Sequence, residues 1–231
     1  MKKLPILFAG ALGALVLAAG ANASTLDDVR KRGHLQCGIN TGLPGFAAPD
    51  DKGVWRGFDV DFCRAVAAAV FGDATKVKYT NLTGKTRFTA LRSGEIDLLS
   101  RNTTWTFSRD ADLQLTFVGV NYYDGQGFIA PKKLGVKSAR DLGGAPVRIH
   151  TRPTPELHLA DYFRKNNMTY QPVPIETNAE ARTNYLAGRC DVYTTDRSGL
   201  AASRAAFAKP NDHVVLPEVI SKEPLGPVVR Q

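Results

Sequence analysis

The sequence has few residues of the kinds that hold metals or cofactors. Its 231 residues include three cysteines and four histidines, and no two cysteines lie in C-x-x-C spacing. Zinc sites need several thiolate or imidazole ligands at characteristic spacings. The histidines are instead scattered, at positions 34, 150, 158 and 213. We therefore predict that the protein holds no metal and no cofactor.

Motifs for nucleotide binding and catalysis are also missing. The stretch TGKT at 83–86 resembles the end of a phosphate-binding loop, but Tyr79 stands where that motif requires its first glycine. Without this glycine the backbone cannot wrap a phosphate. The G-x-S-x-G elbow of hydrolases is absent from the sequence. Catalysis therefore has little direct support.

The charge distribution argues against a nucleic-acid partner. The formal net charge is +8, but the basic residues are dispersed, with acidic residues between them. A nucleic-acid surface needs clustered Lys and Arg interleaved with aromatic residues. We expect a solvated surface on a monomeric protein, with no nucleic-acid partner.

One long apolar run is present, at the N-terminus. Two lysines precede an apolar segment at 4–19, and Ala-Asn-Ala at 21–23 supplies the small-x-small pattern of a cleavage site. These features predict a signal peptide at 1–23 and a mature chain that begins at Ser24 and is secreted to the periplasm. A retained membrane anchor is the alternative, but the apolar segment is short for spanning a bilayer.

The cysteines allow one disulfide in an oxidising compartment. Cys37 lies in an expected strand and Cys63 in the helix that follows, so these two are able to pair across that contact. The alternative is that both, together with Cys190, are buried small hydrophobic residues.

The first half of the chain alternates between strands and helices. Strands are expected at 34–40, 76–82 and 95–100, and helices at 24–33, 57–72 and 85–94. In the helix at 57–72, apolar residues recur every fourth position from Phe58 to Val70, which makes one face apolar. The β-α-β-α-β order predicts a mostly parallel sheet flanked by helices.

The second half repeats this order. Strands are expected at 145–150, 170–175 and 190–195, and helices at 155–166 and 178–190. The related tetrapeptides GEID (94–97) and GRCD (188–191) occupy equivalent places in the two halves. We therefore predict an α/β protein of two similar lobes, lobe 1 at 24–126 and lobe 2 at 134–217. Two crossover strands would join them, one at 127–133 and one within 218–231.

Polar side chains follow the last strand of each half. The segment 101–109 includes Asn102, Thr103, Thr104 and Arg109, and the segment 195–198 includes Asp196. Ligands of open α/β sheets bind beyond the carboxyl ends of the strands. A guanidinium grips a carboxylate through two parallel hydrogen bonds, and a carboxylate holds an ammonium. Arg109 facing Asp196 across a cleft would form a receptor for the head group of an α-amino acid. A surface salt bridge or a capped turn is the alternative.

Five stretches together resemble the periplasmic amino-acid-binding proteins of ABC transporters, and among them the general L-amino-acid-binding subunits. They are CGINTGLPGFAAPDDKG (37–53), GFDVDFCRAVAAAVFGD (57–73), LSRNTTWTFSRD (99–110), VNYYDGQGF (120–128) and GRCDVYTTDRSGLAA (188–202). The resemblance implies two lobes that close on a polar L-amino acid, with the permease subunits of an ABC transporter as partners.

The resemblance also implies roles for single residues. Arg109 and Thr104 would take the α-carboxylate of the ligand, with Asn102 on the same wall. Asp196 would take the α-ammonium. Phe46 and Trp105 would border the pocket for the ligand side chain.

The sequence departs from the resemblance in the second lobe. Such proteins usually carry a Gly-Thr-Thr turn whose amides point at the ligand carboxylate, and here the same place is TRPTPE (151–156). Arg152 replaces the glycine, and two prolines lack the N–H donors. Thr154 remains as a donor, and Pro155 suits the first turn of a helix.

Two further departures concern sulfur and length. Arg148 stands where such proteins usually have a cysteine, so we expect Cys190 to remain a thiol and Cys37 to pair with Cys63. Such proteins also continue with further helices beyond the point that this chain reaches at Gln231. We therefore expect a truncated chain that binds weakly and is marginally stable.

The alternative function is a periplasmic enzyme on the same scaffold, resembling the cyclohexadienyl dehydratases. Such an enzyme needs an acid placed against a ring-shaped substrate, and Asp196 is the one candidate that we identify. Holding an amine and a carboxylate is sufficient for binding. We therefore predict a binding protein that performs no chemistry.

Overall fold

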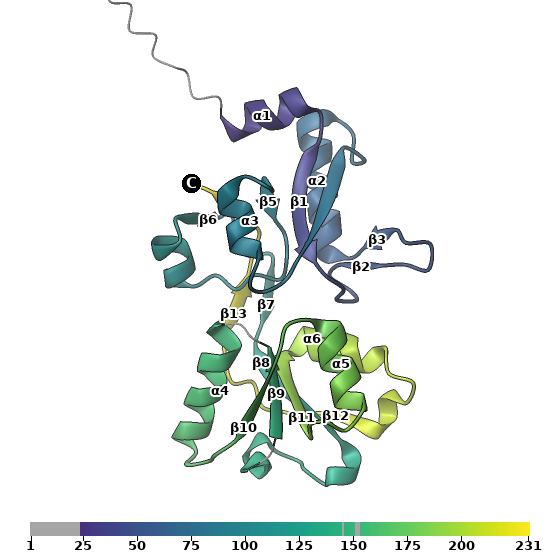
Figure 1. Cartoon of the computed structure of the whole chain (residues 1–231), viewed down its shortest axis with the longest axis vertical. Coiled ribbons are helices and arrows are strands. Elements are labelled where there is room, and N and C mark those ends of the chain that lie inside the picture. Colours follow the sequence, from purple (N-terminus) through teal and green to yellow (C-terminus); the bar gives the residue numbers. More distant parts are fainter. Residues whose placement is uncertain (1–23, 145, 151–152) are drawn as a thin grey trace, which may run out of the picture.

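The structure, a computed structural model, describes residues 24–144, 146–150 and 153–231. It has two lobes, one above the other in Figure 1, each built on a five-stranded sheet. The predicted signal peptide at 1–23 lies outside the described residues. None of the helices in the described ranges has the length and apolar character needed to cross a membrane.

Helix α1 (Thr25–Arg32) begins and ends where the sequence predicts. Ser24 caps it, because its Oγ accepts a hydrogen bond from Asp27 N at 3.3 Å while the Asp27 carboxylate accepts from Ser24. Gly33 ends the helix with a left-handed φ of 78°, a conformation that glycine adopts without a steric penalty.

The sheet of the first lobe has the strand order β4-β1-β5-β14-β6. Its strands are β1 (Leu35–Asn40), β4 (Val77–Leu82), β5 (Leu98–Leu99), β6 (Leu115–Phe117) and β14 (Val228–Arg230). The helices between the parallel strands are α2 (Phe58–Phe71) and α3 (Arg87–Ser93), and a small hairpin, β2 (Ala48–Pro49) with β3 (Trp55–Arg56), precedes α2. Strand β5 is shorter than the predicted 95–100, because the chain leaves the ladder at Ser100 and enters a buried polar segment.

The sheet of the second lobe has the order β10-β9-β11-β8-β12. Its strands are β8 (Gln126–Pro131), β9 (Pro146–His150), β10 (Gln171–Ile175), β11 (Val192–Asp196) and β12 (His213–Val215). Its helices are α4 (Pro153–Lys165), α5 (Asn178–Leu186) and α6 (Arg197–Ala205), and short 3-10 turns lie at Lys132–Leu134, Ala139–Leu142 and Pro210–Asp212. Helix α6 and strand β12 were not among the predicted elements.

The two sheets share one plan, as the sequence repeat predicts. In the first, β4, β1 and β5 pair in parallel and β14 is antiparallel to both β5 and β6. In the second, β10, β9 and β11 pair in parallel and β8 is antiparallel to both β11 and β12. Four of the five strands in each sheet therefore run the same way, which confirms two mostly parallel α/β lobes.

The first crossover strand lies earlier than predicted. We expected it at 127–133, but most of that segment belongs to β8, inside the second sheet, where Phe128, Ile129 and Ala130 are buried. The chain instead passes between the lobes at β7 (Tyr122–Asp124), which pairs antiparallel with β13 (Glu223–Leu225) (Figure 1). The side chains of a central strand point into the cores on both faces of the sheet, so the strand is apolar at every position. Its sequence therefore resembles that of a buried connection between lobes. Strand β13, the partner of β7, lies within the segment 218–231.

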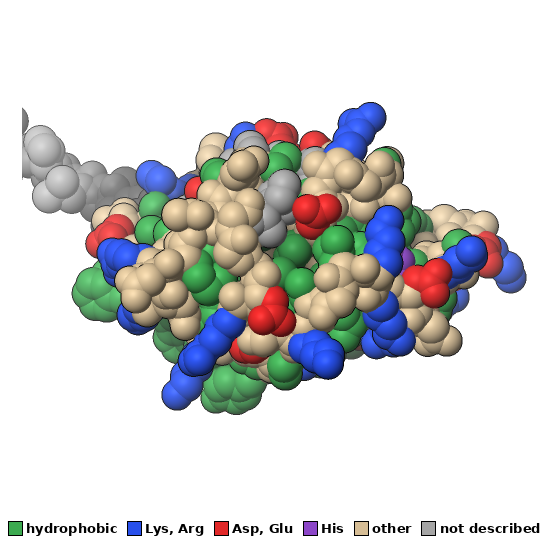
Figure 2. Space-filling view, turned by 90° about the horizontal axis from the view of Figure 1, so that it is seen from below, with side chains coloured by type: hydrophobic (Ala, Val, Ile, Leu, Met, Phe, Trp, Pro, Cys, Tyr) green, Lys and Arg blue, Asp and Glu red, His purple; other side chains and the backbone are tan. Residues whose placement is uncertain are grey.

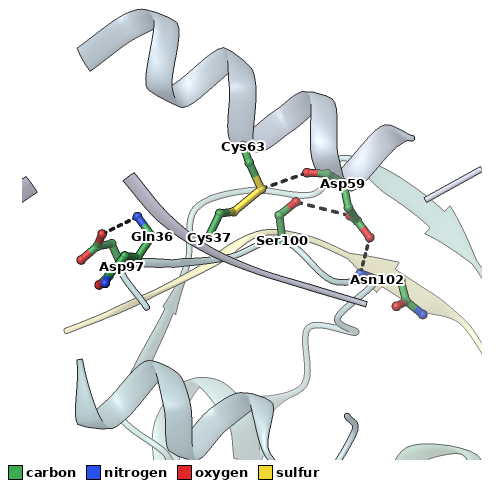
Figure 3. Close-up of a disulfide and its surroundings, with 7 residues drawn as sticks. All are labelled: Gln36, Cys37, Asp59, Cys63, Asp97, Ser100 and Asn102. Atoms are coloured by element: carbon green, nitrogen blue, oxygen red, sulfur yellow. Dashed lines mark hydrogen bonds between the residues drawn. A yellow bond between two sulfur atoms is a disulfide. The ribbon is translucent and has the colours of Figure 1, made fainter. Parts of the chain in front are cut away.

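A disulfide joins α2 to the first sheet. Cys37 of β1 and Cys63 of α2 are bonded, with their Cα atoms 6.2 Å apart and both residues fully buried (Figure 3). The predicted pairing is therefore confirmed, and Cys190 is a buried thiol in the second lobe. Closing a loop of this size stabilises a fold by about 2–4 kcal/mol, mainly by restricting the unfolded chain.

The charged side chains are spread over the surface. On the end of the second lobe that Figure 2 shows, basic and acidic side chains alternate around apolar ones. On α4, Asp161 accepts hydrogen bonds from Arg164 at 2.5 Å and from Lys165 at 2.6 Å. Such exposed pairs contribute about 0–1 kcal/mol each, so this charge serves mainly to solvate the surface.

Candidate functional site

The polar segment that follows β5 is buried. All five residues at 100–104 are at most 6% exposed. Arg101 Nε donates to the carbonyl of Leu82 at 2.7 Å, and Thr103 Oγ1 accepts from Arg87 Nη1 at 3.2 Å. Buried polar groups require such partners. The segment 100–104 is therefore held in one conformation at the carboxyl end of the first sheet.

Asp59, in the first turn of α2, accepts hydrogen bonds from the segment 100–104 (Figure 3). Its Oδ2 accepts from Asn102 N at 3.0 Å and its Oδ1 from Ser100 Oγ at 3.4 Å. Burial raises the pKa of Asp59 to about 6, although the bond from Asn102 and the charge of Arg101 act in the opposite direction. Asn102 has a φ of 31°, which asparagine tolerates better than most residues. The carboxyl group thus stabilises the turn that orients the Asn102 side chain.

Asn102 meets Asp196 where the two lobes touch. Asp196 ends β11 and is 4% exposed. Asn102 Nδ2 donates to Asp196 Oδ2 at 3.2 Å. Asn102 Oδ1 accepts from Asn40 Nδ2 at 3.0 Å, and Asn40 Oδ1 in turn accepts from Asn178 Nδ2 at 3.2 Å. Two residues predicted from equivalent strand ends therefore contact each other across the interlobe boundary.

Arg109 joins the lobes at a second point. It lies in the π-helical turn Ser108–Asp112, and its Nη1 donates to Thr104 O at 2.6 Å. Its Nη2 donates to Thr154 Oγ1 at 3.3 Å, in the first turn of α4 in the second lobe. The guanidinium carbon lies 5.3 Å from the centre of the Phe88 ring, within cation–π range. Helix α4 begins at Pro153, so Pro155 does occupy its first turn.

A cavity of about 590 Å³ opens beside Arg109. Its lining includes Lys85 and Phe88 from the first lobe and Thr154 and His158 from the second. The volume and the mixture of apolar and converging polar groups are typical of small-molecule sites. Another cavity, of about 740 Å³, lies along 122–125 and α6 and contains none of the predicted site residues. We therefore take the cavity beside Arg109 as the candidate site.

Glu223 connects Thr104 to a crossover strand. It is 2% exposed in β13, where Oε2 accepts from Thr104 Oγ1 at 2.6 Å and Oε1 accepts from Ser221 Oγ at 2.8 Å. His158 Nδ1 lies 3.5 Å from Oε1. Burial acts to raise the pKa of Glu223, but the adjacent His158 and hydrogen bonds from Thr104 and Ser221 hold it below its ordinary value. The Thr104 hydroxyl thus donates a hydrogen bond to β13, while the Thr104 carbonyl accepts one from Arg109.

The two aromatic residues predicted to border the side-chain pocket lie elsewhere in this structure. Phe46 is buried in a cluster with Leu43 and Leu225, and its ring makes an edge contact with Tyr122 at 5.4 Å. Trp105 stacks on Phe117 with the ring centres 5.2 Å apart. Neither belongs to the lining of the cavity beside Arg109. The structure therefore groups Arg109 with Thr104 and Thr154, pairs Asn102 with Asp196, and leaves the aromatic residues apart.

Several residues that form the polar contacts between the lobes and with the crossover strand were not predicted from the sequence. Asn40 ends the first strand and Asn178 begins α5, and Glu223 lies on a crossover strand. Asn40 carried a detectable signal, because it follows a buried strand as Asn102 and Asp196 do. Glu223 had none, since Thr104, which it holds, lies 119 positions away in the sequence.

Comparisons with known proteins identify the family of this chain. A family model described as bacterial extracellular solute-binding proteins, family 3, matches residues 35–211. The chain is 62% identical over 230 residues to the glutamate/glutamine/aspartate/asparagine-binding protein BztA of Rhodobacter capsulatus, covering 100% of this chain and 68% of that protein. It is 60% identical over 228 residues to the general L-amino acid-binding periplasmic protein AapJ of Rhizobium johnstonii, covering 97% and 67%.

A solved structure is similar over most of the chain. It is an ABC transporter periplasmic binding protein from Brucella ovis with glutathione bound, with a TM-score of 0.87 and 60% identity over 90% of this chain and 66% of that one. The fold and site define a two-lobed binding protein. The chain belongs to the bacterial extracellular solute-binding proteins, family 3. It spans about two thirds of the length of these relatives.

The family and these relatives are solute-binding proteins. The alternative of a cyclohexadienyl dehydratase on the same scaffold therefore has no support. Among the described residues, no group of three or more His, Cys, Asp or Glu side chains is placed to hold a metal ion.

Proposed function

We propose that the protein binds polar L-amino acids between its lobes and presents them to the permease subunits of an ABC transporter. Two interlobe contacts support this most strongly, Arg109 to Thr154 and Asn102 to Asp196. They bring a buried cation and a buried carboxylate to the boundary of two lobes. The proteins named for binding glutamate, glutamine, aspartate, asparagine or general L-amino acids are 60–62% identical to this chain.

The proposed roles follow from charge. The Arg109 guanidinium takes the α-carboxylate, because a buried guanidinium forms charge-assisted bonds to carboxylate oxygens. Thr104 and Asn102 of the first lobe and Thr154 of the second lobe support this contact. The Asp196 carboxylate takes the α-ammonium. Because every α-amino acid has both groups, these contacts explain binding across several side chains.

The location follows from the family and the N-terminus. We propose that the chain acts as a monomer in the periplasm, after removal of the signal peptide at 1–23. The relatives that are named as periplasmic support this location.

A second ligand class is favoured by one relative and by the cavity. The similar Brucella ovis protein is described with glutathione bound. The cavity beside Arg109 has a volume of about 590 Å³, so it has room for a ligand larger than a single amino acid. Glutathione therefore belongs among the ligands to be tested.

The test is calorimetric titration of the mature protein with glutamate, glutamine, aspartate, asparagine and glutathione. Arg109→Ala should weaken the binding of all four amino acids alike, raising each dissociation constant by a factor of roughly 30 or more. Loss of a buried charge-assisted pair commonly costs about 2–5 kcal/mol. Arg92→Ala, which changes an exposed arginine of α3, is the control and should bind as the unaltered protein does. Loss of binding for only some of the amino acids would contradict the role given to Arg109.

A further inference from the structure

A buried glutamine lies next to Asp196, the carboxylate to which the α-ammonium is assigned. Gln126 begins β8 and is 0% exposed. In the antiparallel pairing of β8 with β11, it lies directly opposite Asp196. Residues directly opposite each other in such a pair project from the same face of the sheet. The side chains of Gln126 and Asp196 therefore leave the second sheet side by side, at the end where Asp196 contacts Asn102 of the first lobe.

The backbone of Gln126 is held by the segment that leads to β13. Its N–H donates to Ser221 Oγ at 2.8 Å, and its carbonyl accepts from Ile220 N at 2.9 Å. The side chain therefore starts from a fixed point beside the crossover between the lobes.

Two acceptors determine how the Gln126 amide is turned. Its Nε2 donates to Thr194 Oγ1 at 3.0 Å and to the carbonyl of Pro155 at 3.2 Å. The Thr194 hydroxyl already donates its hydrogen to the carbonyl of Gly127 at 2.7 Å, so it only accepts from Gln126. Reversing the amide would place Oε1 against two acceptors. Nε2 is therefore turned toward Thr194 and Pro155, and Oε1 is turned away from them.

The oxygen of this amide has no donor of its own. Gln126 Oε1 is buried, and no hydrogen-bond donor among the described residues reaches it. Native structures rarely leave a buried acceptor without a hydrogen bond, because its desolvation is then uncompensated. A group that donates a hydrogen bond is therefore expected at this point.

Gln126 lies between the two contacts proposed for the head group of an amino acid. Asp196 is its neighbour on one side. On the other side is Pro155, which follows Thr154, the residue that accepts from Arg109 Nη2 at 3.3 Å. An ammonium group has three N–H donors, so it can donate to a second acceptor while it contacts a carboxylate.

We propose that Gln126 is a ligand-binding residue whose Oε1 accepts a hydrogen bond from the α-ammonium beside Asp196, an assignment that rests on the function proposed above. Two acceptors on neighbouring strands suit a cation with several N–H donors, whereas a hydroxyl has one. Gln126 thus selects amino acids against the corresponding hydroxy acids, whatever the ligand side chain is.

The test is calorimetric titration of the mature protein with glutamate and with 2-hydroxyglutarate, in which a hydroxyl replaces the ammonium. Gln126→Met has a similar length and removes the amide. Gln171→Met makes the same change at an exposed position of β10 in the same lobe and is the control. Circular dichroism and thermal melting of each variant establish that it is folded.

The dissociation constant for glutamate should rise by roughly 10- to 100-fold in Gln126→Met, because a hydrogen bond from a charged group is lost. The constant for 2-hydroxyglutarate should rise by less than about 10-fold, because a bond from a neutral hydroxyl is weaker. The preference for the amino acid should therefore fall, and it should be unchanged in Gln171→Met. An equal rise for both ligands, which the loss of a purely structural contact would give, would overturn the assignment.

The two proposals fail in different ways. If the unaltered protein binds none of the amino acids, the proposed function and this assignment fall together. If it binds them and Gln126→Met keeps the same preference, only this assignment falls. If Gln126→Met does not fold, a crystal structure of the unaltered protein with glutamate decides. A ligand nitrogen within hydrogen-bond distance of Oε1 would support the assignment, and a water molecule in that place would overturn it.

Discussion

Replacing Asp59 with asparagine should stabilise the protein above about pH 6 and have little effect below pH 4. Burial raises the pKa of Asp59 from 3.8 to about 6 in the folded protein. Between these values the unfolded chain is ionised at this position while the folded protein stays protonated. The folded state therefore binds more protons, and the free energy of unfolding falls as the pH rises through this window.

The size of the effect follows from the shift. About two pKa units at 1.36 kcal/mol each give a penalty of about 3 kcal/mol once Asp59 is ionised in both states. Asparagine does not titrate and has nearly the same shape. Its Oδ1 can accept from Asn102 N, and its amide can donate to Ser100 Oγ, so the two hydrogen bonds of Asp59 have replacements.

The assay is urea unfolding of both proteins at pH 4, 5, 6 and 7, followed by circular dichroism. The difference in unfolding free energy should grow with pH by about 3 kcal/mol in favour of Asp59→Asn. Other titrating groups, among them Glu223 with its lowered pKa, act in the opposite direction but equally in both proteins. Asp61→Asn, which changes an exposed carboxylate of the same helix, is the control. A difference that stays constant from pH 4 to pH 7 would refute the reasoning.

Two further predictions concern the cysteines and the turn between β13 and β14. Thiol titration of the denatured, unreduced protein should find one thiol per chain, that of Cys190, and a count of three would show that no disulfide forms. Gly226→Ala should destabilise the protein by about 1–3 kcal/mol, because the new Cβ would lie 1.9 Å from the backbone oxygen of Gly119. Gly143→Ala, where nothing lies within 4 Å, is its control, and equal melting temperatures for the two variants would contradict the steric argument.

The first crossover strand shows a case in which the sequence pattern does not identify the partner of a strand. The segment 127–131 is apolar and follows the first lobe, which suits a buried connection as well as a central strand. Pairing with β11 and β12 makes most of it a strand of the second sheet. Periodicity describes what surrounds a residue but not which strand lies beside it, because that neighbour comes from a distant part of the chain.

Local chemistry in the sequence by itself determined most of the helices and strands, the two similar lobes and the polar strand ends with Arg109, Asn102 and Asp196, while the Cys37–Cys63 pair was one of two possibilities until the family resemblance favoured it. Caps, glycine stops and apolar periods act within a few residues, so they can be recognised without coordinates. Only the tertiary structure decided that Asn40 and Asn178 join Asn102 to Asp196, and that Glu223 holds Thr104. These contacts link residues far apart in the sequence, from 62 to 138 positions, and a buried hydrogen bond depends on the distance and direction that packing alone sets.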